Sequence, residues 1–198
     1  MTAIRLSGVV LAAGSASRFG ADKLVQPLPT DAHGVAAGTA LAVASWLHLR
    51  TVIPDSIVVV RDARAASARL LAQAGAVLIE CPNADEGMGA SLAAGVAGRS
   101  DADGWLIALG DMPWIAPASI GLVAAALRSG ASIAATRYAG QRGHPVGFSR
   151  AHRDALLALR GDAGARDIVS AYRDETVLVD VDDPGVVRDV DLPDDLKD

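Results

Sequence analysis

Short apolar segments alternate with helix-length segments along almost the whole chain. The predicted strands, judged by apolar character and length, cover residues 6–12, 56–60, 76–79, 104–109, 132–136 and 176–181, with a short extended piece at 146–148. The predicted helices cover residues 36–49, 63–74, 89–98, 117–129, 152–160 and 163–172. This alternation favours an α/β fold, a three-layer α/β/α sandwich with a Rossmann-like, mainly parallel sheet. In such a fold, ligands bind across the carboxyl ends of the strands.

The composition limits the class of protein. The 198 residues are 51% hydrophobic and 21% charged, which indicates a globular chain, and we expect one domain over residues 1–198. The net charge is −5 and no run of Lys or Arg forms a basic stripe, so nucleic acid is not an expected partner. The one cysteine, Cys81, excludes an intrachain disulfide. No signal peptide or long apolar span is visible, so we expect a cytoplasmic protein without membrane contact.

A glycine-rich turn follows the first predicted strand, at the end where a ligand is expected. The chain reads Leu-Ala-Ala-Gly from Leu11 to Gly14, and Arg18 and Lys23 follow with Gly20 between them. Small residues let an anion approach backbone N–H groups, and the two cations add full positive charge. The spacing matches neither a Walker A loop nor a dinucleotide fingerprint. The turn therefore predicts a different kind of phosphate site; the alternative is a plain surface turn with two solvated cations.

Carboxylates occur in two segments, and the first of them is predicted at the same edge of the sheet as the glycine-rich turn. Asp111 comes just past the apolar segment 104–109, and Asp189 and Asp191 share one face if their segment is extended. Mg²⁺ prefers one or two carboxylates together with phosphate oxygens, so these residues are candidate metal ligands. The alternative for Asp111 is a turn residue that satisfies backbone amides before Pro113.

Three further segments combine small residues with polar ones. The stretch 83–91 opens a predicted helix whose free N–H groups can meet a base or ribose, unless it is a simple capping loop. Glycines and a proline surround His144 as at the edge of a shaped pocket, although a lone histidine is more often structural. The stretch 161–166 opens another predicted helix, with Asp162 as a candidate N-cap and Arg166 suited to an anion; an ordinary capped helix is the alternative.

Taken together, these motifs resemble the MobA-like nucleotidyltransferases, with the molybdenum cofactor cytidylyltransferases as the most similar branch. The family pattern Leu-Ala-Ala-Gly-x-Ser-x-Arg-x-Gly-x-x-Lys is matched from Leu11 to Lys23. The later matches are Leu-Gly-Asp-Met-Pro at 109–113, Gly-His-Pro-Val at 143–146, Gly-Asp-x-Gly-Ala-Arg at 161–166 and Asp-x-Asp-x-Pro-x-Asp-Leu at 189–196, where Leu192 replaces the usual Thr. The five motifs occur in the family's order over nearly the whole chain.

The resemblance implies a Mg²⁺-dependent transferase. A phosphate monoester on the acceptor would attack the α-phosphorus of CTP, and pyrophosphate would leave. Ala13 stands where guanylyl-transferring relatives have glycine, and its methyl group would narrow the base pocket in favour of a pyrimidine. The implied acceptor is the molybdopterin-type cofactor, whose cytosine dinucleotide would pass to a molybdoenzyme. Two alternatives stay open: transfer of guanylyl or another nucleotide to a different phosphorylated acceptor, such as a sugar phosphate or phospholactate, and a non-catalytic chaperone that delivers the cofactor.

The resemblance also implies roles for single residues. The catalytic residues would be Arg18, Lys23 and Asp111. The nucleotide site would comprise Leu11, Ala12, Ala13, Gly14, Arg18, Lys23, Glu86, Gly87 and Ser91. The metal ligands would be Asp111 and Asp191, and the acceptor site would comprise His144, Pro145, Asp162, Gly164 and Arg166. Segment 25–44 departs from the family pattern, which puts its local geometry and the choice of substrate in question.

Overall fold

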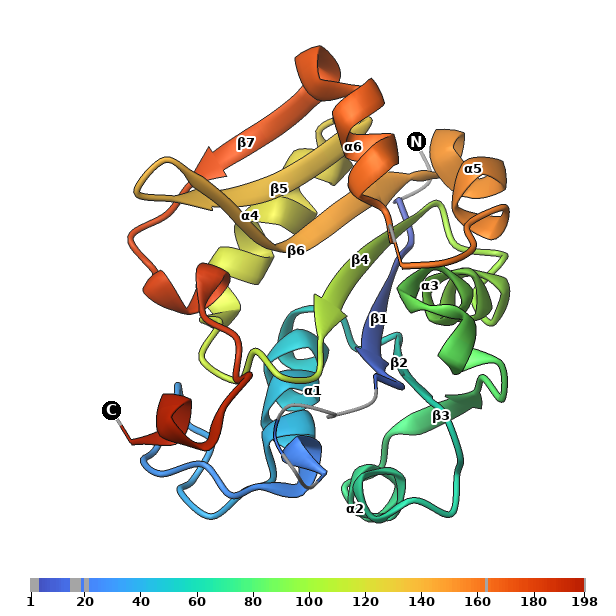
Figure 1. Cartoon of the computed structure of the whole chain (residues 1–198). Coiled ribbons are helices and arrows are strands. Elements are labelled where there is room, and N and C mark those ends of the chain that lie inside the picture. The colour runs from blue at the N-terminus through green and yellow to red at the C-terminus, as the bar shows by residue number, and fades with distance from the viewer. Residues whose placement is uncertain (1–3, 15–18, 20–21, 163, 198) are drawn as a thin grey trace.

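Seven strands form one sheet at the centre of the computed structural model, which describes residues 4–14, 19, 22–162 and 164–197. The strands are β1 (Leu6–Ala12), β2 (Ser56–Val60), β3 (Val77–Glu80), β4 (Gly104–Leu109), β5 (Ile133–Tyr138), β6 (Gln141–Ser149) and β7 (Thr176–Asp180). Their order is β3-β2-β1-β4-β6-β5-β7, and of these strands β6 alone runs antiparallel to its neighbours (Figure 1). The expected mainly parallel α/β sheet is confirmed.

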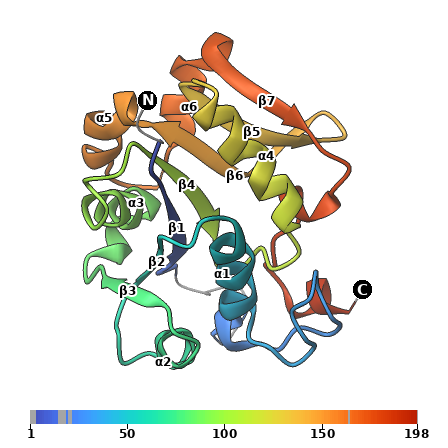
Figure 2. The ribbon, with the colours of Figure 1, turned by 180° about the vertical axis from the view of Figure 1, so that it is seen from behind.

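Helices cover both faces of the sheet, as Figures 1 and 2 show from opposite sides. One face carries α1 (Leu41–Val52), α2 (Ala66–Gln73) and α4 (Pro117–Arg128); the other carries α3 (Met88–Ala97), α5 (Arg153–Leu157) and α6 (Arg166–Ala171). Successive strand residues point to opposite faces, so Val10 belongs to the core cluster of Trp46 and Val9 to that of Leu92. The result is the predicted three-layer sandwich. Among the described residues, no helix has the length and hydropathy needed to span a bilayer.

Helix α1 begins at Leu41, so the prediction of a helix from residue 36 is wrong at its start. Residues 26–40 instead form a loop that is closed by its own backbone: the Leu28 N–H donates to the Thr39 carbonyl over 2.8 Å, and the Leu41 N–H donates to the Gln26 carbonyl over 3.0 Å. The alanine-rich sequence favours a helix. In the loop, however, these hydrogen bonds already pair backbone N–H and carbonyl groups that a helix would otherwise pair. This loop is the part of the chain that departs from the family pattern.

The two helices predicted after residue 150 are shorter than expected. The predicted helix 152–160 divides into a 3₁₀ turn, Arg150–His152, and α5. The predicted helix 163–172 is only six residues long, and the residue at its N-cap position is Ala165. Asp162 therefore lies ahead of the helix, and its predicted role as N-cap is wrong. The Gly89 N–H, at the start of α3, donates to the Gly161 carbonyl over 2.8 Å, so Gly161 lies against α3 before the helix begins.

Strand β6 has nine residues rather than the three predicted at 146–148. It lies between β4 and β5, with Val146 in register with Ile107 on one side and with Ala135 on the other. Ladders on both sides hold an extended backbone through a stretch whose glycines and proline are disfavoured in strands. Because β6 is antiparallel, its first residues lie at the carboxyl end of β4 and bring His144 there.

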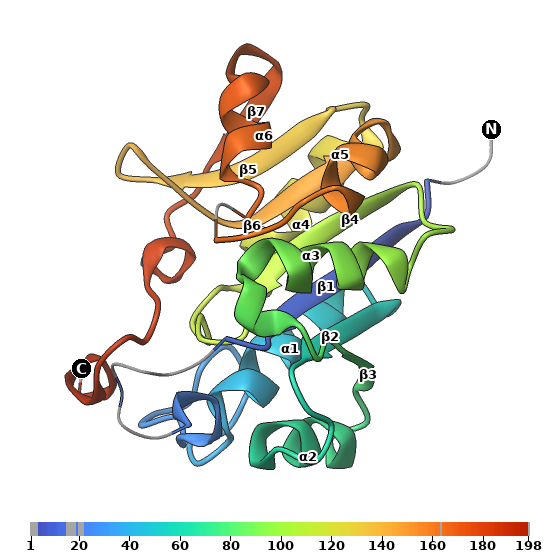
Figure 3. The ribbon, with the colours of Figure 1, turned by 45° about the vertical axis from the view of Figure 1, so that its right-hand side comes forward.

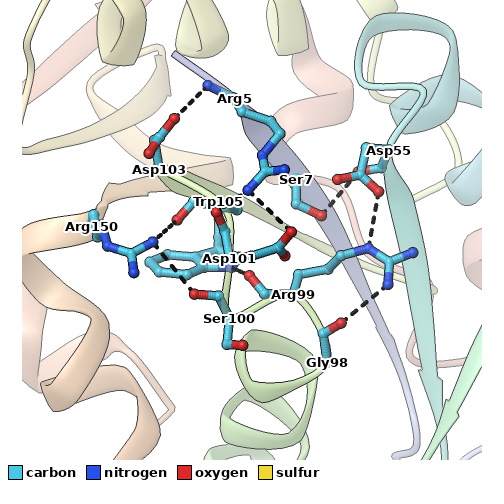
Figure 4. Close-up of polar contacts among 11 residues, drawn as sticks. Arg5, Ser7, Asp55, Gly98, Arg99, Ser100, Asp101, Asp103, Trp105 and Arg150 are labelled. Atoms are coloured by element: carbon cyan, nitrogen blue, oxygen red, sulfur yellow. Dashed lines mark hydrogen bonds and ion pairs between the residues drawn. The ribbon is translucent and has the colours of Figure 1, made fainter. Parts of the chain in front are cut away.

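The amino ends of the parallel strands carry a network of paired charges (Figure 4). The Arg99 guanidinium donates to Asp55 over 2.9 Å, and the Arg5 backbone N–H donates to Asp103 over 2.9 Å. The Arg150 guanidinium donates to backbone carbonyls, the nearer at 2.8 Å. These groups satisfy one another, so this end of the sheet is closed by structural contacts.

Candidate active site

A cavity of about 480 Å³ opens at the carboxyl ends of β1 and β4. It is lined by Leu11, Ala12, Ala13, Gly14, Lys23, Leu24, Arg61, Ala84, Asp85, Gly87, Met88, Ser91, Leu109, Asp111 and Asp162. A Cβ added at Gly14 would meet nothing within 4 Å, so Gly14, just after β1, presents bare backbone beside this space. Seven residues predicted for the nucleotide site line the cavity, whereas Glu86 does not; Arg18 lies outside the described residues.

A second cavity of about 350 Å³ adjoins the first. The two share Leu11, Met88, Leu109 and Asp162. The second is further lined by Leu92, Ile107, Arg142, Gly143, His144, Val146, Phe148, Ala165, Arg166 and Val169. Three residues predicted for the acceptor site, His144, Asp162 and Arg166, therefore lie here. Pro145 and Gly164 are not among the lining residues; a Cβ at Gly164 would meet the Met88 sulfur at 3.1 Å, so Gly164 packs behind the shared wall.

The carboxyl-terminal segment crosses this end of the sheet and is fixed by the buried carboxylate of Asp183. Asp183 accepts hydrogen bonds from the Ala116 N–H at 2.9 Å, the Ser119 hydroxyl at 2.7 Å and the Gly185 N–H at 3.0 Å. A Cβ at Gly185 would collide with the Trp114 carbonyl, so glycine permits the close approach. Farther along, the Val190 N–H donates to the Asp111 carbonyl over 3.0 Å. A segment from the end of the chain is thereby held against the residues that follow β4.

Three carboxylates meet where that segment crosses. Ligand oxygens of Asp111, Asp189 and Asp191 all lie within 4.8 Å of one another. One oxygen of Asp111 is buried and has no hydrogen-bond partner among the described residues, which is costly for a carboxylate unless a cation reaches it. Partial burial and the charges of Asp111 and Asp191 raise the pKa of Asp189. An all-oxygen, anionic donor set of this kind fits a hard divalent cation.

Lys23 lies against the same carboxylates. It opens a 3₁₀ turn whose N-cap, Asp22, accepts from the Leu24 N–H. The ammonium lies 2.7 Å from Asp111 Oδ2 and 3.1 Å from Asp191 Oδ1. Burial alone would lower the pKa of Lys23, but the hydrogen bonds to both carboxylates and their charges outweigh it and raise the pKa. Lys23 therefore remains a cation, and it shares carboxylate oxygens with any metal ion bound there.

His144 extends from β6 into the second cavity. The Thr136 hydroxyl donates to the His144 carbonyl over 2.9 Å and fixes the backbone at that point. Burial lowers the pKa of His144, against a smaller opposing effect of the Ile107 backbone and the Asp111 charge. The neutral imidazole has a buried Nδ1 without a hydrogen-bond partner among the described residues. The side chain can thus offer a hydrogen bond to a ligand without adding charge.

The sequence reasoning missed several lining residues. Arg61 follows β2, the parallel neighbour of β1, and its Nε donates to the Ala13 carbonyl over 3.4 Å. The rule that parallel strands end at one edge of a sheet was sufficient to find it. No sequence pattern indicates that Met88 and Arg142 line a cavity, because their positions depend on how α3 and β6 pack. Asp189 appeared as a candidate but was left out of the metal set.

Comparisons with known proteins identify the family. The model of the MobA-like NTP transferase domain matches residues 8–177. The purine catabolism protein PucB of Bacillus subtilis is 29% identical over 199 residues, covering 95% of this chain and 92% of PucB. The crystal structure of Rv0371c from Mycobacterium tuberculosis H37Rv is 30% identical with a TM-score of 0.80, over 99% of this chain and 97% of that one. The structure of the Rv0371c complex with manganese has 29% identity and a TM-score of 0.75, over 98% and 96%. The chain belongs to the MobA-like NTP transferase family and is a nucleotidyltransferase.

Proposed function

We propose that this nucleotidyltransferase transfers the cytidylyl group of CTP to the phosphate of a molybdopterin-type cofactor, releasing pyrophosphate. The observation that carries the proposal is the pair of adjoining cavities. The first is lined by the bare backbone of Gly14 and by Lys23 and Asp111, as a triphosphate requires. The second is lined by His144 and Arg166 beside apolar side chains, as a phosphorylated aromatic acceptor requires. Their shared wall brings two substrates into contact.

Mg²⁺ is the proposed metal. Asp111, Asp189 and Asp191 would hold it, as the unpartnered oxygen of Asp111 and the anionic donor set support. When bound, the ion neutralises phosphate oxygens. The manganese complex of Rv0371c supports a divalent cation in a related protein.

The chain's own residues would act by position and charge. The second pKa of a phosphate monoester is about 6, so the acceptor is already anionic near neutrality and needs no strong base. His144, with its lowered pKa, would serve as a neutral hydrogen-bonding group. Lys23 would neutralise the triphosphate and the departing pyrophosphate, together with Arg18. The cavity walls would keep the two phosphates in line.

Ala13 supports the preference for CTP. The side chain is buried, 2% exposed, and lines the first cavity. Its methyl group takes space that a glycine would leave to a larger purine. In the variant Ala13→Gly, the ratio of GTP to CTP turnover should rise, and Ala12→Gly, which alters the neighbouring lining residue, serves as the comparison.

Pyrophosphate release tests the proposal. CTP, GTP, UTP and ATP are compared with Mg²⁺, with and without the molybdenum cofactor. We expect release with CTP only when the cofactor is present. Release with GTP in place of CTP would overturn the base assignment, and CTP-dependent stabilisation without release would indicate a delivery chaperone.

The name of PucB favours a second candidate, in which the transfer serves purine breakdown with a different phosphorylated acceptor. In the assay with CTP, this candidate is favoured over the first if a purine-derived phosphate supports pyrophosphate release and the molybdenum cofactor does not.

A further inference from the structure

A third cavity, of about 200 Å³, lies beside the second, which we call the acceptor cavity, and neither Asp111 nor Lys23 is among its lining residues. We call it the distal cavity; it is lined by Arg142, Val169, Ser170, Arg173, Thr176 and Leu178. Arg142 and Val169 line the acceptor cavity as well, so the two spaces are contiguous. The walls come from β6, from β7 and from α6 with the turn after it. In the sheet, β5 lies between β6 and β7, and Figures 1 and 3 show α6 close to β7.

The register of the sheet explains why these side chains meet. Thr176 and Leu178 of β7 are paired with Ile133 and Ala135 of β5, which belong to the core cluster on the α6 face. Paired residues of neighbouring strands point to the same side of a sheet, so Thr176 and Leu178 also face α6. The distal cavity therefore lies between α6 and the edge strand of the sheet.

The guanidinium groups around this space lack partners. Arg142, Arg166 and Arg173 make no hydrogen bond or ion pair through their side chains with any residue in the described ranges. Arg137, opposite Arg142 in the sheet, is held by both oxygens of Asp180 at 2.6 and 2.7 Å. Arg142 has no such carboxylate among the described residues, so its exposed guanidinium is available to an anion that enters the cavity.

The overall charge sharpens this point. The chain has 23 acidic residues and 18 Lys and Arg, so acidic side chains are plentiful. Most arginines elsewhere use them or backbone carbonyls, as Arg99 does with Asp55. Arg166 lines the acceptor cavity, Arg173 lines the distal cavity and Arg142 lines both, so three exposed guanidinium groups without such partners among the described residues can receive an anion with oxygen acceptors. The hydroxyls of Ser170 and Thr176 add two further donors to the distal end.

We propose that the distal cavity is an anion subsite of the acceptor. The inference rests on the proposed function: the acceptor presents its reacting phosphate at the shared wall and a second anionic group, bearing oxygen acceptors, to Arg142 and Arg173. An acceptor with two anionic ends would lie along the apolar floor formed by Phe148 and Val169. The subsite selects elongated acceptors with an anionic group at each end over small phosphate monoesters, which have one.

Arginine modification tests the subsite without turnover. Native protein is treated with phenylglyoxal, with and without inorganic phosphate, and the modification of each arginine is followed by mass spectrometry. We expect phosphate to slow modification of Arg142 and Arg173 several-fold. Arg69, an exposed arginine on α2 outside the three cavities, is the internal control and should react at an unchanged rate. If phosphate leaves the modification rates of Arg142 and Arg173 unchanged, as it should that of Arg69, the proposal is overturned.

Steady-state kinetics then tests whether the subsite binds the acceptor. Arg173→Gln should raise the KM for the acceptor about tenfold while leaving the KM for CTP unchanged, because one charged hydrogen bond is lost. Arg173→Lys should restore part of the loss, and Arg69→Gln should change neither constant. An unchanged acceptor KM in Arg173→Gln would overturn the subsite even when phosphate protects the arginine. Absence of pyrophosphate release in the native protein would refute the proposed function instead, whatever the protection experiment gives.

Discussion

The two ends of the central sheet differ in how far their polar side chains are paired with other protein groups. At the amino end, Arg99 is paired with Asp55, and Arg150 donates to backbone carbonyls (Figure 4). At the carboxyl end, one oxygen of Asp111 and the Nδ1 atom of His144 are buried without a hydrogen-bond partner among the described residues. Buried polar groups are normally satisfied. Ser56 and Trp46 also have a buried atom without a partner among the described residues, but neither lines the three cavities. Asp111 and His144 do line cavities, so there a ligand can complete the hydrogen bonding.

The difference follows from how each end is assembled. The amino end is made by short connections beside the strands that they join. The contacts of these connections can serve stability alone. The carboxyl end gathers the turn after β1, the segment after β4, the start of β6 and the carboxyl-terminal segment. Like charges are brought together there, which costs stability and is retained where function requires it.

The largest expected effect is at Asp111. Asp111→Asn removes a negative charge from the proposed metal site, so nucleotidyl transfer should fall by about 10³-fold or more. Mn²⁺ binding, followed by electron paramagnetic resonance, should weaken in parallel, while circular dichroism stays native. The control is Asp101→Asn at the amino end, which should leave both unchanged. A fully active Asp111→Asn protein would remove Asp111 from the mechanism.

Lys23 should show two effects of opposite sign. In Lys23→Met, transfer should fall by about 10²-fold, because the charge that neutralises the triphosphate is gone. Mn²⁺ affinity in the absence of nucleotide should rise, because an ammonium no longer competes for oxygens of Asp111 and Asp191. Lys197→Met, which removes an exposed lysine, is the control. Weaker Mn²⁺ binding in Lys23→Met would contradict the shared use of those oxygens.

Asp183 links the fold to the site. Asp183→Ala leaves three donors without their acceptor and should lower the free energy of unfolding by about 3 kcal/mol, as measured by urea denaturation. Because the segment that carries Asp189 and Asp191 is then released, Mn²⁺ affinity should also fall. Asp182→Ala, an exposed neighbour, should change neither. Loss of stability with native Mn²⁺ affinity would show that the segment is held by other contacts.

Acid should weaken the fold through histidines that are buried in the neutral form. Burial lowers the pKa of His48 and outweighs the hydrogen bond between its ring and the Ala32 carbonyl, which acts in the opposite direction. Below about 6.5 the unfolded chain therefore binds more protons than the folded one, so the free energy of unfolding decreases as the pH falls through that value. Urea denaturation between pH 7.5 and 5.0 should show this decrease, and His48→Gln should reduce it. An identical pH dependence in the variant would exclude His48 as a contributor.

The smallest effect is expected at the amino end. Arg99→Ala breaks a partly exposed ion pair and should cost about 1 kcal/mol in urea denaturation. Nucleotidyl transfer should remain at the native rate, because no cavity residue depends on this contact. A large loss of activity would show that the two ends of the sheet are coupled.

The sequence was most reliable where a local pattern decides the structure. The apolar strands and most of the helices lie within a few residues of their predicted positions, since buried strands need short apolar runs and helices a longer period. It failed where long-range contacts override propensity: the loop before Leu41 replaces an alanine-rich helix, and β6 extends through glycines and a proline. The predicted neighbourhood of Lys23 and Asp111 is present, whereas Arg142 and Met88 were missed.

Local chemistry along the chain thus determined the alternating α/β layers, the glycine turn and the family. The tertiary structure alone decided that Asp189 joins Asp111 and Asp191, and that Arg142 lines both the acceptor cavity and the distal cavity. The physical reason is that a carboxylate's or a guanidinium's role depends on the charges and cavities within a few ångströms. Those neighbours come from strands and loops that are far apart in sequence and meet only when the sheet is formed.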